Sequence, residues 1–112
     1  MNIVEVIERQ LEAYNARDLD RFLAEYSDNI RAFRPPAIEP SIVGKAALAE
    51  FYSTQRFNRP ALHADVLNRM VLGSFVIDHE RISGIQDQPF EVAIVYQLVD
   101  GLIQCTWAFA AR

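Results

Sequence analysis

The chain has 112 residues, of which 51% are hydrophobic, and a formal net charge of −4 at pH 7. These values fit one globular domain, residues 1–112, with a well-stocked core. Its cations are nearly all arginines and are scattered, which is unlike the clustered basic face of nucleic-acid binders. The single Cys105 rules out an internal disulfide, and no apolar stretch reaches the ~18 residues of a membrane helix. We therefore expect a cytoplasmic protein with no membrane or nucleic-acid partner.

The N-terminal half has the pattern of helices. Apolar residues that recur every three or four positions predict an amphipathic helix over residues 3–16, which Asn2 can cap. A second, shorter helix is expected to begin after Asp18, a typical capping residue. The segments expected next are a short strand near residues 29–34, a proline-broken loop over 35–43 and a third helix over 45–56.

From Ala61 onward the apolar pattern changes to period two, which is typical of strands. Gly73, Gly84 and Asp100-Gly101 punctuate it and predict short turns. The four expected strands cover residues 62–72, 74–84, 89–99 and 102–111. Consecutive strands joined by short turns form an antiparallel meander. Helices followed by such strands predict an α+β fold, in which three helices pack on one face of a curved sheet and a small cavity lies between them.

The second of these strands carries Asp78, His79 and Glu80 within an apolar run. Side chains alternate along a strand, so Asp78 and Glu80 share one face and His79 lies on the other. If the shared face lines a cavity, desolvation and mutual repulsion raise the pKa of one carboxyl and favour acid–base chemistry. If that face meets water or arginines, the carboxylates are structural. The sequence leaves both readings open.

Strand pairing places other polar residues near these carboxylates. A hairpin across Gly84–Gln88 puts Asp78 near Tyr96 and Glu80 near Ile94, on the concave side of the sheet. A hairpin across Gly73 puts Asn68 opposite Asp78. The candidate catalytic residues are therefore Asp78 or Glu80 as the base, with Tyr96 or, from the first helix, Tyr14 as the hydrogen-bond donor.

The remaining candidate ligand-binding residues are mostly aromatic. They are Phe33, Phe51, Tyr52, Phe57, His63, Asn68, Ile94 and Trp107. For the aromatic residues Phe33, Phe51, Tyr52 and Phe57, plain core is the favoured reading over pocket wall, because aromatic residues at helical spacing need no ligand to explain them. No metal site is expected, because Asp78, His79 and Glu80 are consecutive on a strand and cannot converge on one ion, and no HxH, HExxH or CxxC spacing occurs.

The face that Trp107 occupies depends on the last turn. A two-residue turn at Asp100-Gly101 pairs Ile94 with Trp107 and places the indole in the cavity. A three-residue turn with Gly101 in a bulge reverses the parity. Trp107, Cys105 and Phe109 then lie on the convex face, where they form an apolar dimer surface.

Three segments, LEAYNARDLDRFLAEYSDNI, IVGKAALAEFY and VDGLI, in this order and spacing, resemble the NTF2-like superfamily. That superfamily includes ketosteroid isomerase, scytalone dehydratase, limonene epoxide hydrolase and SnoaL-type polyketide cyclases. The resemblance implies a cone-shaped α+β fold with an apolar pocket, often a homodimer, but no single reaction. It also favours the convex face for Trp107. The catalytic positions of ketosteroid isomerase fall near Gln10, Arg34 and Ile94, none of which keeps the catalytic residue type, so that activity is not expected.

The leading hypothesis is an enzyme that binds a small hydrophobic molecule and performs cofactor-free isomerisation, cyclisation or dehydration with acid–base carboxylates. The alternative is a ligand-binding or dimerisation module without catalysis. In either case the expected partner besides the ligand is a second copy of the chain, bound through the convex sheet face.

Overall fold

A computed structural model describes residues 2–111. Its elements are α1 (Ile3–Ala16), α2 (Leu19–Leu23), β1 (Tyr26–Phe33), β2 (Ile42–Val43), α3 (Lys45–Gln55), β3 (His63–Leu72), β4 (Phe75–Ser83), β5 (Phe90–Val99) and β6 (Leu102–Ala110). The α+β class and the expected order of elements are confirmed. The short strand β2, at the end of the proline loop, is an addition to the prediction. Within residues 2–111, no helix is both long and apolar enough to cross a membrane.

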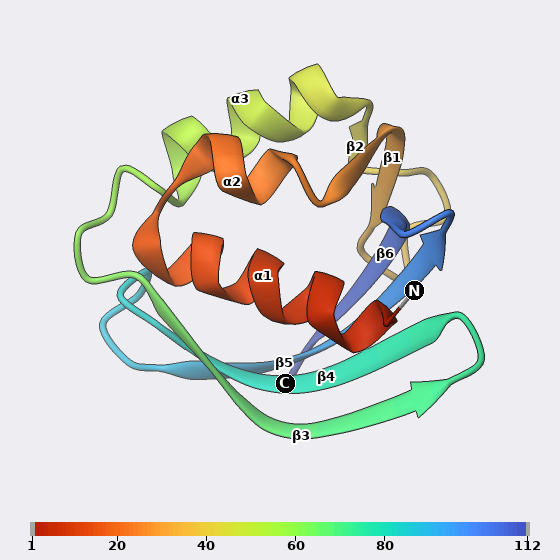
Figure 1. The fold of residues 1–112 in the computed structure, drawn as a ribbon. Helices are drawn as coiled ribbons and strands as arrows, with labels where there is room; N and C mark the ends of the chain where they lie inside the picture. Colours follow the sequence, from red (N-terminus) through yellow and green to blue (C-terminus); the bar gives the residue numbers. More distant parts are fainter. Residues whose placement is uncertain (1, 112) are drawn as a thin grey trace.

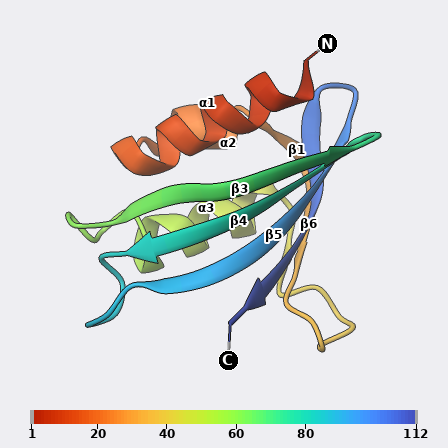
Figure 2. The ribbon, with the colours of Figure 1, turned by 90° about the horizontal axis from the view of Figure 1, so that it is seen from below.

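The strands form one six-stranded sheet in the order β2-β1-β6-β5-β4-β3. The last four strands are an antiparallel meander, and β1 runs parallel to β6. The sheet curves beneath the helices, which all lie on one of its faces (Figure 1). Seen from below, β3, β4, β5 and β6 lie side by side across the opposite face (Figure 2). We call the helix-covered face concave and the opposite face convex.

The helix starts follow from capping residues. The Asn2 side chain accepts a hydrogen bond from the Val4 backbone N–H at 3.0 Å, at the start of α1. The Asp18 carboxylate accepts one from the Arg21 N–H at 3.2 Å, at the start of α2. These bonds satisfy backbone donors that a helix cannot pair internally. They confirm both predicted caps.

The core lies between the helices and the concave face of the sheet. Phe22 of α2 is completely buried at its centre. Its ring centroid lies 4.6 Å from that of Tyr52, 4.9 Å from Tyr26 and 5.2 Å from Phe57. Such close aromatic packing fixes α2 and α3 against the start of β1. One end of the space between helices and sheet is thereby filled.

Two predicted strand registers are wrong, although the predicted faces of Asp78 and Glu80 are correct. Asp78 pairs with Ile94 rather than Tyr96, and Glu80 pairs with Val92 rather than Ile94, a shift of two positions that keeps each side chain on its face. Between β3 and β4, Leu67 is the extra residue of a bulge. Beyond this bulge, the two-residue turn Gly73-Ser74 sets the register, since Leu72 pairs with Phe75, and it places Asn68 opposite His79 on the convex face, not opposite Asp78.

A second bulge decides the face of Trp107. Asp100-Gly101 is a two-residue turn, since Val99 pairs with Leu102, but Gln104 is an extra residue beyond it. The parity therefore reverses after Gln104, and Thr106, not Trp107, lies beside Tyr96. The indole is on the convex face, half-buried, and stacks on the Phe33 ring at a centroid distance of 5.7 Å. Trp107 therefore does not line the cavity.

Candidate functional site

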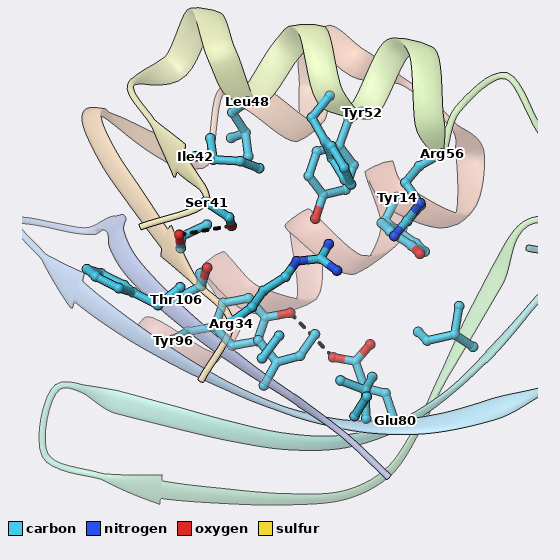
Figure 3. Close-up of a pocket in the computed structure, with 18 of the residues that line it drawn as sticks. Tyr14, Arg34, Ser41, Ile42, Leu48, Tyr52, Arg56, Glu80, Tyr96 and Thr106 are labelled. Atoms are coloured by element: carbon cyan, nitrogen blue, oxygen red, sulfur yellow. Dashed lines mark hydrogen bonds between the residues drawn. The ribbon is translucent and has the colours of Figure 1, made fainter. Parts of the chain in front are cut away.

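A cavity of about 520 Å³ lies between the concave face of the sheet and the helices (Figure 3). Its walls are mainly apolar side chains from α1, β2, α3 and the strands of the meander. These include Leu11, Ile42, Leu48, Phe51, Ile82, Val92, Ile94 and Ala108. A cavity of this size, with apolar walls and a few polar groups, suits a small organic molecule.

Glu80 is the one carboxylate that lines this cavity among residues 2–111. It projects from the concave face of β4 and is only 4% exposed. The Tyr96 hydroxyl donates a hydrogen bond to Glu80 Oε2 at 3.3 Å (Figure 3). Although the two residues are not cross-strand partners, both side chains are long enough to meet along the sheet. The carboxylate is thus oriented by a buried donor and has free capacity to contact a ligand.

The environment of Glu80 shifts its protonation toward neutral pH. Burial is the main cause that raises the pKa of Glu80, to about 7, and the negative charge of Asp78 adds to the effect. The Tyr96 hydrogen bond and the charge of Arg69 oppose it. Near pH 7 the carboxyl group therefore exists in both protonation states. This is the property needed by a group that takes up and returns a proton.

Asp78 has a different role from the one predicted. It is 1% exposed and does not line the cavity. Arg69 holds it with two hydrogen bonds, from Nε to Oδ1 at 2.7 Å and from Nη2 to Oδ2 at 2.9 Å, and also contacts Glu8 of α1. The sequence left open whether these carboxylates are structural or line a cavity, and the structure shows one of each kind. Asp78 is the structural, arginine-paired one, and Glu80 is the one in the cavity.

Several tyrosines supply neutral donors around the cavity. Tyr14, Tyr52 and Tyr96 all line it, and burial raises the pKa of each phenol. They therefore stay protonated at neutral pH and can donate hydrogen bonds. Tyr26 is already engaged, since its hydroxyl donates to Gln10 Oε1 at 3.2 Å. Tyr14 and Tyr52 are the donors best placed to meet a ligand oxygen.

The structure divides the other predicted ligand contacts. Phe33, Phe51, Tyr52 and Ile94 border the cavity, whereas Phe57, His63, Asn68 and Trp107 do not. Phe57 is part of the aromatic core beside Phe22. His63 is exposed and its Nε2 lies 3.0 Å from Asp65 Oδ1, and Asn68 contacts the His79 ring on the convex face at 3.2 Å. The turn at Gly73-Ser74 places Asn68 on the convex face, and the bulge at Gln104 does the same for Trp107.

Two arginines of the cavity wall, Arg34 and Arg56, were not predicted as ligand contacts. Arg34 follows β1, and Arg56 is the C-cap of α3. The family resemblance did contain a signal, because all three positions matched to catalytic residues of ketosteroid isomerase, Gln10, Arg34 and Ile94, line the cavity. The residue types differ from those of ketosteroid isomerase, but the positions in the fold correspond.

Among residues 2–111, no group of three His, Cys, Asp or Glu side chains is arranged to hold a metal ion.

Helices packed on a strongly curved sheet, with a cavity between them, define this chain as an NTF2-like cone. A family model described as a SnoaL-like domain matches residues 7–105. The chain therefore belongs to the SnoaL-like family. A search of curated proteins finds no match.

Solved structures from several bacteria share the fold. An uncharacterised cystatin-fold protein from Novosphingobium aromaticivorans has a TM-score of 0.86 at 20% identity, over 96% of this chain and 97% of that one. A Kribbella flavida protein, provisionally described as a ketosteroid isomerase, has a TM-score of 0.83 at 18% identity, over 98% and 78%. A provisional SnoaL-like polyketide cyclase from Jannaschia sp. CCS1 has a TM-score of 0.82 at 18% identity, over 96% and 84%. At these identities the likeness establishes the fold alone.

Proposed function

We propose that this protein is a cofactor-independent acid–base enzyme that acts on a small hydrophobic carbonyl compound. The observation that carries the proposal is Glu80, a buried carboxyl group in an apolar cavity with a pKa raised to about 7. A base of this kind removes a proton from carbon next to a carbonyl group and returns it elsewhere. Isomerisation, cyclisation and dehydration all proceed through such a step. The provisional descriptions of two related structures as isomerase and cyclase are consistent with this class.

Each polar group has a place in the proposed reaction. Glu80 in its ionised form takes the proton, and the Tyr96 hydroxyl keeps the carboxylate oriented. Proton removal leaves negative charge on the substrate oxygen. The neutral hydroxyls of Tyr14 or Tyr52 donate hydrogen bonds to that oxygen. Asp78 affects Glu80 only through its charge, because both of its carboxylate oxygens accept hydrogen bonds from Arg69.

Hydrogen–deuterium exchange tests this function without knowledge of the natural substrate. A panel of apolar ketones with acidic α-hydrogens, 2-tetralone among them, is incubated with the protein in D2O and followed by proton NMR. The proposal requires exchange above the buffer rate for at least one ketone, and this exchange must depend on Glu80. Exchange that never exceeds the buffer rate would contradict it.

The convex face supports a second proposal, that the protein forms a homodimer there. Cross-strand pairing aligns an apolar row across this face of the sheet: Met70, Ile77, Val95, Trp107 and Phe33. Phe109 lies beside the row and is 44% exposed. A continuous apolar surface on a sheet face is a typical protein interface. A dimer of this kind is compatible both with an enzyme and with a non-catalytic dimerisation module.

Trp107→Lys is expected to convert the dimer into a monomer, because it places a charge in the middle of the apolar row. Light scattering after size-exclusion chromatography measures the mass directly. Trp107→Phe is the matched control and keeps the dimer, since it preserves an apolar ring that can stack on Phe33. A wild-type protein that runs as a monomer, or a dimer that survives Trp107→Lys, would refute the convex interface.

A further inference from the structure

Two arginines from different elements lie beside the same aromatic ring in the cavity wall. The guanidinium carbon of Arg34 is 5.5 Å from the ring centroid of Phe51, and that of Arg56 is 4.9 Å from it. In Figure 3 the Arg34 side chain points into the cavity, and Arg56 lies beside Tyr14. Contact with the ring holds both cations at the wall formed by α3. The cavity therefore has a positively charged side.

Neither guanidinium has a carboxylate partner within residues 2–111, where the arginine ion pairs are made by other residues. A guanidinium group has five N–H donors. Arg56 uses one of them, on Nη1, to donate a hydrogen bond to the Gln55 carbonyl oxygen at 2.9 Å. Burial is the main cause that lowers the pKa of Arg56, and the positive charge of Arg34 contributes. Two neighbouring cations, one of them partly desolvated, are thus left without an anion.

A third donor faces the same region. The Tyr52 hydroxyl points from α3 into the cavity (Figure 3). The positive charges of Arg56 and Arg34 both lower the pKa of this phenol, against the larger effect of burial. Glu80 projects from the sheet on the other side of the cavity. The cavity is therefore polarised, with cationic and phenolic donors toward α3 and the titrating carboxyl group on β4.

We propose that the ligand is an apolar molecule with one anionic group of the carboxylate type, which Arg34 and Arg56 bind together while its carbon skeleton extends toward Glu80. Guanidinium groups match a carboxylate in geometry and charge. A neutral, sterol-like ligand would instead desolvate both cations without pairing them, which costs binding energy. This inference rests on the proposed function of the same cavity and names the class of substrate. It also explains why a chain with a net charge of −4 places positive charge in its cavity.

Calorimetric titration with a matched pair of probes tests the assignment. 1-Naphthylacetate and 1-naphthylacetamide have nearly the same shape, and only the first is charged. We expect the wild type to bind the acid about tenfold or more tightly than the amide. The double variant Arg34→Met/Arg56→Met should bind both with a ratio of about one. Methionine keeps apolar contact with Phe51, and circular dichroism checks that the variant is folded.

Arg59→Met is the matched control, because Arg59 follows α3, has no carboxylate partner in the described chain and does not line the cavity. It should keep the preference for the acid. Equal binding of acid and amide by the wild type, or a preference that survives the double variant, overturns the anionic-ligand assignment. So does a failure of the acid to bind at ~1 mM.

Glu80→Gln separates this inference from the proposed function. That variant should keep the preference for the acid, since the arginines are unchanged. Glu80-dependent exchange of ketones without any preference for the acid would leave the enzyme intact and remove the anionic ligand. A clear preference for the acid, together with an exchange rate that does not change in Glu80→Gln, would support the anionic ligand and contradict the acid–base enzyme.

Discussion

Glu80→Gln is expected to lower the rate of α-hydrogen exchange in bound ketones by about 10²–10⁴-fold, the usual contribution of a general base. Glutamine keeps the shape of the side chain and can still accept a hydrogen bond from Tyr96, but it cannot take up a proton. The fold should survive, because the substitution removes a buried ionisable group and adds no bulk. Exchange followed by proton NMR in D2O measures the effect.

The pH profile gives this prediction a second readout. The active form of the base is the ionised carboxylate, and its pKa is raised to about 7. The exchange rate catalysed by the protein should therefore rise with pH and level off above that value. Glu91→Gln is the control, because Glu91 is an exposed carboxylate that contacts His79 on the convex side. Wild-type rates in Glu80→Gln, or an equal loss in Glu91→Gln, would exclude Glu80 as the base.

Arg69→Met is expected to give the largest loss of stability, about 3–5 kcal/mol in the free energy of unfolding at pH 7. The reason is that Asp78, which is 1% exposed, would lose both hydrogen bonds from Arg69 and remain as an unpaired buried charge. The Glu8 contact that ties α1 to β3 would be lost as well. Urea unfolding measures the change. The pKa of Glu80 should rise further, since the charge of Arg69 lowers it.

Two comparisons show whether this loss comes from the unpaired carboxylate. Adding Asp78→Asn to Arg69→Met should recover a large part of the stability, because the buried charge is then gone. Arg21→Met removes only the exposed contact with Glu12, 3.7 Å long, and should cost no more than about 1 kcal/mol. If the double variant is as unstable as Arg69→Met, packing of the arginine stem rather than charge pairing stabilises this region.

The sequence was sufficient for the face of each carboxylate but not for its neighbours. Alternation along β4 places Asp78 and Glu80 together on the concave side, and a register error of two positions leaves that conclusion intact. Tyr96 was predicted to lie near Asp78, but its hydroxyl contacts Glu80 on the same face instead. Two long side chains on one face can meet even when their backbones are not paired.

The ion pair of Asp78 was missed because it depends on the length of the turn between β3 and β4. Gly73 and Ser74 form a two-residue turn, since Leu72 pairs with Phe75, and the regular register that follows brings Arg69 opposite Asp78, where the predicted pairing placed Asn68. The bulge at Gln104 likewise decides the face of Trp107. Gln104 has neither a glycine nor another local signal of irregularity beside it. The charged cavity wall was missed for a different reason, since Arg34 and Arg56 lie outside regular strands, where periodicity gives no direction.

The titration of Glu80 tests the central claim most directly. Carbon NMR of the side-chain carboxyl groups, followed from pH 3 to pH 9, gives the pKa of Glu80 in the folded protein. We predict a value of about 7, with Asp78→Asn lowering it because the neighbouring negative charge is removed. A value at or below the ordinary 4.5 would mean a solvated or ion-paired carboxylate. Such a result would contradict the acid–base enzyme and leave a protein that binds its ligand without transforming it.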